Sequence, residues 1–407
     1  MKIAYVTSRY PVLTETFVAR EIQEVVDLGH DVLACQLRPA WNYREATAMR
    51  SDSVRIVKWN WNVFSMLWAN LCALAGRPGP YLDCVRDMVR AFGRISRIGH
   101  VVYILLVSAW IARTLSREKI DHIHCHFLRT EAVGGMWIAR LMGKRFSVTE
   151  HTKFLYPARS LSLRAINDAA FLVADIGEVR EMLNELSGEK GCPIHFVRNG
   201  IKLGDLPLRT PGGPHDNPPP TLLAIGRLCD YKGFDILIQA CARLEQKGIP
   251  FRCRIIGEGP ERPLLEKLRA DLQLDEKVDL PGEVTFSELR TEYDRAAVLV
   301  VPSRGTEFTD GLPTVAIEAL AMGIPTVATR WAGIPDLIID GETGLLAEPN
   351  SIPSLAEKVG EMLTKKEQWS GFASRGRKII EDEYDLSANV KRLVAHWEEA
   401  VKECVHR

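Results

Sequence analysis

Short apolar runs alternate with longer amphipathic stretches along most of the chain. Residues 3–7 read as a buried strand, and residues 15–28 as a helix with its apolar side chains on one side. Gly29 is placed to end that helix, and residues 31–35 read as the next strand. Strands that alternate with helices in this way predict an α/β fold with a mostly parallel sheet.

The alternation continues in two series. The first series predicts further strands at residues 122–127, 145–149, 171–174 and 194–197. The second predicts strands at residues 221–225, 253–256, 278–280, 298–301 and 326–328. Between the series, residues 206–220 contain six prolines and two adjacent glycines, which favours a linker. We therefore expect domains at 1–205 and 221–385, with a helix at 386–407 that crosses back to the first domain. Ligands of such parallel sheets bind beyond the carboxyl ends of the strands.

Residues 56–115 break the pattern and predict a helical insertion. Apolar and aromatic side chains crowd this stretch, and Arg86, Arg90, Arg94 and Arg97 are interleaved with them. Two interpretations stay open: core helices packed on the sheet, or a surface that contacts a membrane or a lipid-linked substrate. The longest apolar run, residues 101–112, is shorter than the roughly 20 residues that a spanning helix needs.

Composition narrows the function classes. The 407 residues are 46% hydrophobic and 26% charged, as in an ordinary globular protein. Lys+Arg and Asp+Glu both number 52, which argues against nucleic-acid binding through bulk charge. Nine scattered cysteines without a CxxC pair argue against a disulfide framework and a zinc ribbon. The cysteines and the start of the chain, which shows no signal peptide, predict a cytoplasmic protein.

Two segments of the second series suit an anionic ligand. Gly226, Arg227 and Lys232 follow its first strand, where a guanidinium fork and an ammonium can meet one diphosphate. Residues 310–318 run from a loop into a helix that Pro313 is placed to begin, so its free N–H groups can bind an anion. Asp310 and Glu318 flank that site and could accept hydrogen bonds from sugar hydroxyls. Solvated cations, a helix cap and a surface glutamate are the plainer alternatives.

Polar residues also follow strands of the first series. His122, His124 and His126 share one face of a strand, and we expect one or two of them near its carboxyl end to line a cleft while the others face solvent. The sequence supplies no closed set of metal ligands around them, so no metal is predicted. His151 follows another strand and can donate to a ligand or carry a proton, or be purely structural.

Three further segments are weaker candidates. Asn199 reads first as part of a tight turn. The segment around Glu258 resembles a dinucleotide fingerprint but lacks its third glycine, which argues against NAD. Thr14, Glu15 and Thr16 stand at a helix start, where they could cap the helix or hold an acceptor hydroxyl.

Together these motifs resemble retaining glycosyltransferases of family 4. The segments IGRLCDYKGFDILIQA, IIGEGPER and DGLPTVAIEALAMGIPTVAT carry the resemblance in the second half, and SRYPVLTETFVAREI, DHIHCHF and VRNGI in the first. The opening loop is most similar to the branch that builds exopolysaccharides such as colanic acid. The resemblance implies the GT-B architecture: two Rossmann-like doubly wound domains facing a cleft.

The resemblance also implies roles for the residues. It implies transfer of a hexose from a nucleotide diphosphate sugar, UDP- or GDP-linked, to a saccharide or lipid-linked acceptor, without a required metal. Arg227 and Lys232 would hold the diphosphate, Glu318 the ribose, and His151 would lie by the hexose. The donor would also be contacted by Gly226, Glu258, Asp310, Gly311, Leu312, Pro313, Thr314 and Asn199. The acceptor side would be formed by Thr14, Glu15, Thr16 and His126.

The chain departs from the family pattern at three places. Asp310 stands where the family has glutamate, the first loop has Ser8-Arg9-Tyr10-Pro11 where many members have glycines, and Thr152-Lys153-Phe154 follows His151. An epimerase on the same architecture is an alternative to a transferase. A catalytically silent sugar-nucleotide scaffold is another, and the Asp310 substitution is the hint toward it. The expected location is cytoplasmic, with peripheral contact to the inner membrane face.

Overall fold

The computed structural model describes residues 1–407 except 13–14, 39–50, 59–61, 92–97, 154–158, 189–190, 210–217, 306–310 and 406–407. The chain divides into two compact units. The first contains Met1–Gly200 and Leu386–Arg407, and the second contains Ile201–Asp385. The chain thus enters the second unit before the proline-rich segment, whose described residues 206–209 and 218–220 belong to that unit.

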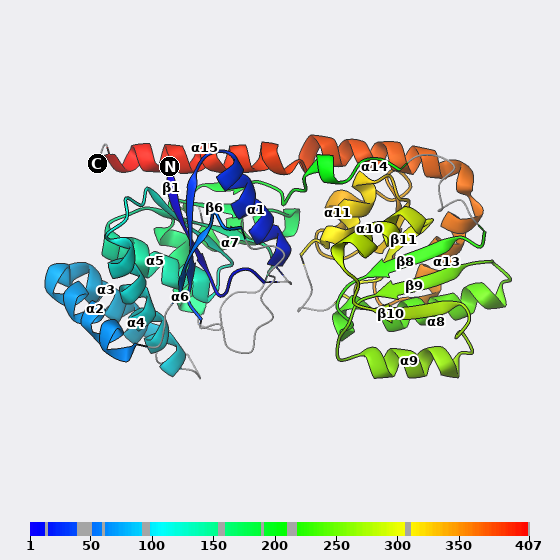
Figure 1. Ribbon diagram of the computed structural model, residues 1–407, viewed down its shortest axis with the longest axis horizontal. Helices are drawn as coiled ribbons and strands as arrows, with labels where there is room; N and C mark the ends of the chain where they lie inside the picture. The colour runs from blue at the N-terminus through cyan, green and yellow to red at the C-terminus, as the bar shows by residue number, and fades with distance from the viewer. Residues whose placement is uncertain are drawn as a thin grey trace. The chain divides into compact units, whose positions relative to one another are not determined.

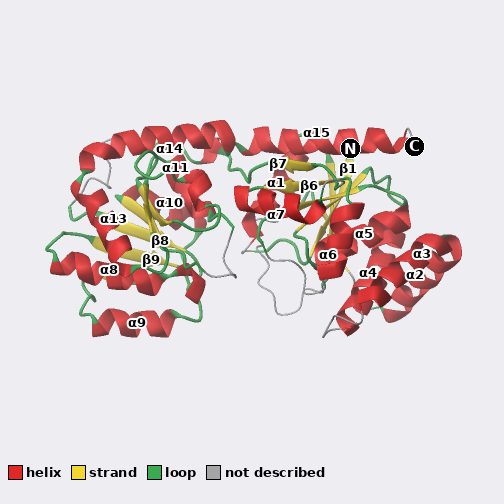
Figure 2. Cartoon of the chain, turned by 180° about the vertical axis from the view of Figure 1, so that it is seen from behind, coloured by secondary structure: helices red, strands yellow, loops and turns green. Residues whose placement is uncertain are grey.

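The first unit is built on a seven-stranded sheet in the order β3-β2-β1-β4-β5-β6-β7, in which every neighbouring pair is parallel (Figures 1 and 2). Its strands are β1 (Lys2–Thr7), β2 (Asp31–Gln36), β3 (Arg55–Lys58), β4 (His122–His126), β5 (Phe146–Glu150), β6 (Phe171–Ala174) and β7 (Ile194–Phe196). The central strands are buried along almost their whole length, because helices cover both faces of a parallel sheet. This burial explains their continuous apolar runs.

Among its described residues the first unit has eight helices. They are α1 (Thr16–Asp27), α2 (Val63–Gly76), α3 (Pro78–Ala91), α4 (Ile98–Leu115), α5 (Thr130–Met142), α6 (Arg159–Asp168), α7 (Gly177–Ser187) and α15 (Leu386–Val405). The insertion predicted over residues 56–115 is helical only from Val63 on, because Arg55–Lys58 forms the edge strand β3. Helices α2, α3 and α4 pack on one another, and α4 also packs on α5.

Helix α15 completes the core of the first unit. Its side chains Leu393 and Trp397 are buried together with Ile3 and Tyr5 of β1. The Trp397 indole N–H lies 3.2 Å from the Ser147 hydroxyl of β5, so the helix is tied to the sheet by a polar contact as well. The carboxyl-terminal helix is therefore an integral layer of the first unit.

The second unit has a six-stranded parallel sheet in the order β10-β9-β8-β11-β12-β13. Its strands are β8 (Thr221–Ile225), β9 (Arg252–Ile256), β10 (Val278–Gly282), β11 (Val298–Val301), β12 (Thr326–Thr329) and β13 (Leu345–Ala347). Its helices are α8 (Phe234–Gln246), α9 (Arg262–Asp271), α10 (Phe286–Arg295), α11 (Thr314–Ala321), α12 (Ile334–Leu337), α13 (Ile352–Thr364) and α14 (Trp369–Glu383).

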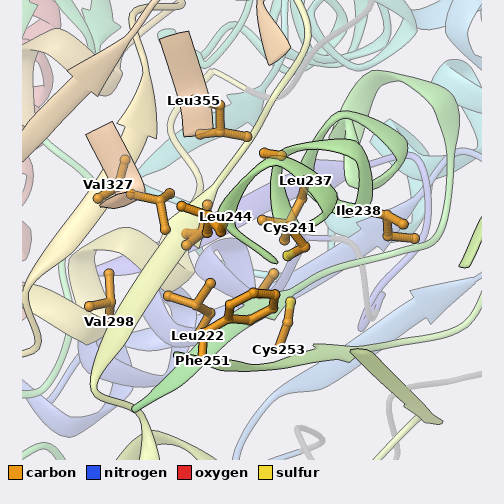
Figure 3. Packing of buried hydrophobic residues seen from close by; sticks show 14 of the residues in the cluster. Leu222, Leu237, Ile238, Cys241, Leu244, Phe251, Cys253, Val298, Val327 and Leu355 are labelled. Atoms are coloured by element: carbon orange, nitrogen blue, oxygen red, sulfur yellow. The ribbon is translucent and has the colours of Figure 1, made fainter. Parts of the chain in front are cut away.

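Two apolar clusters hold this sheet from its two faces. On one face, Leu222 and Cys253 of the strands meet Leu237, Cys241 and Leu244 of α8 (Figure 3). On the other, Leu223 and Leu299 are buried with residues of α11, α10 and α14. The sheet is thus a rigid base, and the loops at its carboxyl edge are held by packed elements on both sides.

Candidate active site

The loop after β8 is folded tightly against two neighbouring loops. Leu228 donates its backbone N–H to the Glu258 carbonyl at 2.9 Å, and Glu261 donates to the Leu228 carbonyl at 3.0 Å. A Cβ on Gly257 would lie 1.9 Å from the Gly226 carbonyl oxygen, and one on Gly259 would lie 2.2 Å from the Leu228 oxygen. The GxG segment that resembles a dinucleotide fingerprint is therefore needed for loop packing. Glu258 itself pairs with Arg262 at 3.4 Å.

The side chains of the two predicted cations, Arg227 and Lys232, differ in their surroundings. Arg227 is exposed, and its guanidinium has no hydrogen-bond or ion-pair partner in the part of the chain that the structure describes. The Lys232 side chain is half-buried and runs past Gly226, whose hypothetical Cβ would lie 3.4 Å from Lys232 Cε. Its ammonium lies 5.9 Å from the centre of the Tyr231 ring. Both cations thus lie on one loop at the carboxyl end of β8.

A third cation, Arg304, lies beside this loop. Its Nε is 3.2 Å from Asp230 Oδ1, and its guanidinium also pairs with Asp235 at 2.5 Å. The Arg304 backbone N–H donates to the Tyr231 carbonyl at 2.8 Å. Gly233 makes this approach feasible, because its backbone has φ +68° and a Cβ there would lie 2.1 Å from the Pro302 oxygen. Arg304 thus fixes the turn Asp230–Lys232. No local sequence motif predicted this role.

Glu318 is a buried carboxylate near the start of α11. Its Oε2 accepts a 2.7 Å hydrogen bond from the Tyr293 hydroxyl of α10. Its side chain is 7% exposed, which excludes the plain surface glutamate of the sequence alternatives. Sequence reasoning missed Tyr293, because only the fold brings α10 and α11 together.

Gly311 and Leu312, just before α11, are held by contacts with other parts of the same unit. Gly311 accepts a backbone hydrogen bond from Gly333 at 2.8 Å. Pro313 is the residue that caps the helix and Thr314 its first residue, one position later than predicted, because Pro313 keeps an extended backbone with ψ 119°. Leu312 packs against the core. Asp310 lies outside the described residues.

All three histidines of β4 are buried, which corrects the expectation that some of them face solvent. His122, His124 and His126 are 0%, 0% and 1% exposed, because helices cover both faces of the sheet at this strand. His122 and His124 both bond the Ser147 hydroxyl at 2.8 Å. Burial, helped by the Arg145 charge, lowers the pKa of His122 to about 3. These two rings are neutral core residues.

His126 and His151 belong to a polar chain at the carboxyl edge of the first sheet. His126 Nδ1 lies 2.8 Å from His151 Nε2, and His151 Nδ1 lies 2.8 Å from Asp175 Oδ2. On the other side, His126 Nε2 lies 3.2 Å from Glu21 Oε1. Both nitrogens of His151 are thus engaged inside the unit, so a sugar could bond one of them only by replacing an existing partner.

Groups around this chain complete the site. Asn199 donates to Asp175 Oδ2 at 2.7 Å, and the Tyr5 hydroxyl donates to Glu21 at 2.8 Å. Glu21 and Asn199 also line one narrow pocket, whose remaining walls come from Phe17, Thr149, Arg198 and α15. Neither Glu21 nor Asp175 was predicted. Asp175, like His151, comes directly after a buried strand, and that position was the signal available for it.

Glu15 and Thr16, which were predicted for the acceptor side, lie at the start of α1. Glu15 is the residue before the helix and makes no side-chain cap bond, and Thr16 is the first helical residue. Burial raises the pKa of Glu15, and the charges of His151 and Arg129 lower it in part, so Glu15 lies near the polar chain. Thr14 lies outside the described residues.

Glu21, His124 and His126 bring three possible ligand atoms within 4.8 Å of one another. However, both nitrogens of His124 have hydroxyl partners, Ser147 and Thr149, and both nitrogens of His126 are bonded as described above. Hydrogen bonds therefore account for the cluster, and we interpret it as a hydrogen-bonded network.

The helical insertion exposes an apolar stripe. Phe64, Trp68 and Leu71 of α2 are 86%, 58% and 59% exposed. Val63 and Leu67 lie on the same stripe, and Arg86 and Arg90 are exposed on α3, while Arg94 and Arg97 lie outside the described residues. Helix α4 has 18 residues and is long and apolar enough to cross a membrane by length and composition alone, but half of it is buried against the rest of the unit, as in a core helix. Helix α4 extends three residues beyond the apolar run 101–112 at each end.

Two family models match the chain on either side of the proline-rich segment. Residues 14–205 match "Glycosyltransferase Family 4", and residues 219–365 match "Glycosyl transferases group 1". The putative colanic acid biosynthesis glycosyltransferase WcaL of Salmonella typhimurium is 26% identical, covering 97% of this chain and 99% of that protein. The amylovoran biosynthesis glycosyltransferase AmsK of Erwinia amylovora is 27% identical, covering 88% and 89%.

Solved structures agree on the fold. The Anabaena protein HepE in complex with UDP superposes with a TM-score of 0.75 at 16% identity, covering 98% of this chain and all of that one. Sucrose-phosphate synthase from Thermosynechococcus elongatus gives 0.72 at 16% identity, covering 98% of each chain. The chain thus belongs to glycosyltransferase family 4, a retaining family that transfers sugar from nucleotide sugars, and it has the GT-B fold.

Proposed function

We propose that this protein transfers a hexose from a nucleotide diphosphate sugar to a polysaccharide-repeat or lipid-linked acceptor, with retention and without a required metal. The observation that carries the proposal is the loop after β8. Glycine contacts fix its backbone, Arg304 fixes its turn, and the cationic side chains of Arg227 and Lys232 both lie on it. Relatives named for colanic acid and amylovoran biosynthesis support the acceptor class.

The second unit holds the donor in this proposal. Arg227 and Lys232 bind the diphosphate and stabilise the negative charge that develops on it as it leaves. The amides around Leu312–Thr314 and the N-terminus of α11 add to that stabilisation. Glu318, already oriented by Tyr293, accepts hydrogen bonds from ribose hydroxyls. These preplaced groups supply the stabilisation that a metal gives in other transferases, and the acceptor hydroxyl attacks on the side from which the diphosphate leaves.

Residues of the first unit serve the sugar and the acceptor in this proposal. Glu15 and Thr16 bind the acceptor side, and His126 and His151 lie near the transferred hexose. His151 acts there as a charged or orienting group, because both of its nitrogens are bonded inside the unit. The proposed transfer uses no covalent nucleophile from the described residues.

The test is a thermal-shift screen of UDP, GDP, ADP and their sugar conjugates, followed by donor turnover with and without saccharide acceptors. UDP is tested first, because structures of the Anabaena relative contain UDP or UDP-glucose. A nucleotide at 100 times its dissociation constant should stabilise the protein by about 2.7 kcal/mol. Stabilisation by one class with acceptor-dependent turnover supports the proposal. Isomerisation of the donor without acceptor would indicate an epimerase, and binding without turnover a scaffold.

We further propose that the first unit docks on the cytoplasmic face of a membrane through α2. The exposed stripe of Phe64, Trp68 and Leu71 supplies apolar area, and the exposed arginines of α3 suit anionic headgroups. Cosedimentation with anionic vesicles should fall in a Phe64→Ser, Trp68→Ser variant. Leu264→Ser on α9, a site with 61% exposure, is the matched control. Equal binding of all three proteins would rule α2 out.

A further inference from the structure

Four side chains from four elements form one continuous line of contacts in the first unit. In order they are Asp175 after β6, His151 after β5, His126 at the end of β4, and Glu21 on α1. The three contacts between them measure 2.8, 2.8 and 3.2 Å. Asp175, His151 and His126 are 3%, 4% and 1% exposed, so water does not replace these contacts. The protons in these three hydrogen bonds must therefore come from the four side chains themselves.

Counting those protons gives a definite result. Each of the three contacts needs one proton between its two heavy atoms, since nitrogen and carboxylate lone pairs otherwise face each other. Ionised carboxylates supply none, and two neutral imidazole rings supply one each. The line therefore holds one proton more than its neutral rings provide, and that proton makes either an imidazolium or a carboxylic acid.

The surroundings favour ionised carboxylates. Glu21 accepts a second hydrogen bond from the Tyr5 hydroxyl, and Asp175 accepts one from the Asn199 amide, whose longer contact to His151 Nδ1 is 3.3 Å. Burial alone would raise the pKa of Glu21, but the charge and hydrogen bond of His126, with Tyr5, bring it below its usual value. Burial alone would lower the pKa of His151, but Asp175, Glu150 and Glu21 bring it above its usual value.

We infer that the His126–His151 pair carries one retained imidazolium charge, held by Glu21 and Asp175 as positioning residues, and that sugar transfer requires this charge at the carboxyl edge of the first sheet. The step inside the pair is balanced. When the central proton is on His151 Nε2, His151 is the imidazolium and His126 keeps its proton on Nε2. When that proton moves to His126 Nδ1, His126 is the imidazolium and His151 keeps its proton on Nδ1.

The charge lies at the edge of the sheet where ligands of parallel sheets bind. Parallel sheets bind ligands beyond the carboxyl ends of their strands, and both histidines lie at those ends. Glu21 at one end of the line, and Asn199, which donates to Asp175 at the other end, border the same narrow pocket. The requirement for transfer rests on the proposed function, in which His126 and His151 lie near the transferred hexose.

Most of the described ionisable groups around the pair are carboxyl groups or neutral side chains. His124 is a neutral ring, since burial and its neighbouring histidines lower its pKa well below the usual value. Glu150 accepts hydrogen bonds from the backbone N–H groups of Leu128 and His151. The titratable and charged groups that face the pair, from β1, α1, β4, β5, β6 and the loop after β4, are Tyr5, Glu15, Glu21, His124, Arg129, Glu150 and Asp175.

Two nearly isosteric variants test the count. In Glu21→Gln the carboxamide can donate to His126 Nε2, and in Asp175→Asn it can donate to His151 Nδ1. Either donor lets both rings be neutral while all three contacts keep a proton. Asp27→Asn, an exposed carboxylate at the end of the same helix as Glu21, is the matched control.

The first readout is the side-chain ¹⁵N NMR spectrum of ¹⁵N-histidine-labelled full-length protein, which needs no turnover. Wild type and Asp27→Asn should keep one imidazolium at pH 8, and both test variants should lose it. Two neutral rings in folded wild type at pH 8 would overturn the inference even if a variant failed to fold. So would stoichiometric zinc binding that displaces the His126 protons.

The second readout is the pH profile of kcat. Loss of the flanking carboxylate should move the alkaline limb down by about 1–3 pH units, the usual effect of removing a close opposite charge. An unchanged limb in both folded variants would overturn the requirement for transfer. If no donor is turned over by wild type, the proposed function fails, while the NMR result still decides whether the charge exists.

Discussion

The two units present their polar groups in opposite ways. In the second unit, backbone contacts through Gly257 and Gly233 fix a loop, and the cations on it are partly exposed. In the first, side chains from four elements bond one another and are almost completely buried. The difference shows that a fixed backbone suits recognition of an incoming anion, while a buried side-chain network suits control of protonation.

The largest expected effect is on catalysis and tests the partly exposed cations of the second unit. Lys232→Ala should lower kcat about 10²–10³-fold, as removal of one preorganised charge contact does elsewhere. The thermal unfolding midpoint without ligand should change little, because the half-buried ammonium is not part of the core. Lys247→Ala, at an exposed site after α8, is the control. Transfer at the wild-type rate in Lys232→Ala would remove this loop from the active site.

The next effect probes the backbone that holds the loop. Gly257→Ala should lower the free energy of unfolding by at least about 1–3 kcal/mol, because its φ of +142° is strained for alanine and the Cβ would meet the Gly226 oxygen at 1.9 Å. Gly248→Ala also has positive φ, +66°, but open space around the Cβ, so it should lose less. Urea unfolding measures both. Equal losses would mean that the loop contact is dispensable.

The smallest effect concerns the neutral histidines of the first unit. The pKa of folded His122 is lowered from 6.5 to about 3, so between these pH values only the unfolded chain takes up this proton. Stability should therefore fall as pH drops below 6.5, by about 2 kcal/mol for this group at pH 5. His122→Gln should show that much less loss between pH 7 and pH 5 in urea unfolding, whereas the partly exposed His100→Gln should follow wild type. Identical curves for all three would mean that His122 is protonated in the fold.

The sequence predicted the sheets well because buried parallel strands leave unbroken apolar runs. The strands Phe171–Ala174, Thr221–Ile225 and Val298–Val301 have the predicted bounds residue for residue. It missed β3, which has charged residues at both ends and lies at the sheet edge, and β13, which has only three residues. Short edge strands get their stability from a neighbour, and that neighbour is not visible in the local pattern.

The site was predictable only where one local segment carries it. The loop with Arg227 and Lys232 joins cations to glycines within a few residues, so its sequence alone indicated an anion site. Glu21 and Asp175 gained their roles from partners that are 105 and 24 residues away. Tyr293 likewise reaches Glu318 only through packing of two helices. Long-range pairing of this kind depends on tertiary contacts that periodicity does not encode.

Helix α15 has a consequence for how the molecule is made. The first unit needs Trp397 to close its core around Tyr5, yet residues 386–405 leave the ribosome only after the whole second unit has been translated. All strands of the second unit are translated before α15, so that unit can fold first, while part of one face of the first unit's sheet stays uncovered until α15 is made. The unit that is translated first is therefore the one that is completed last.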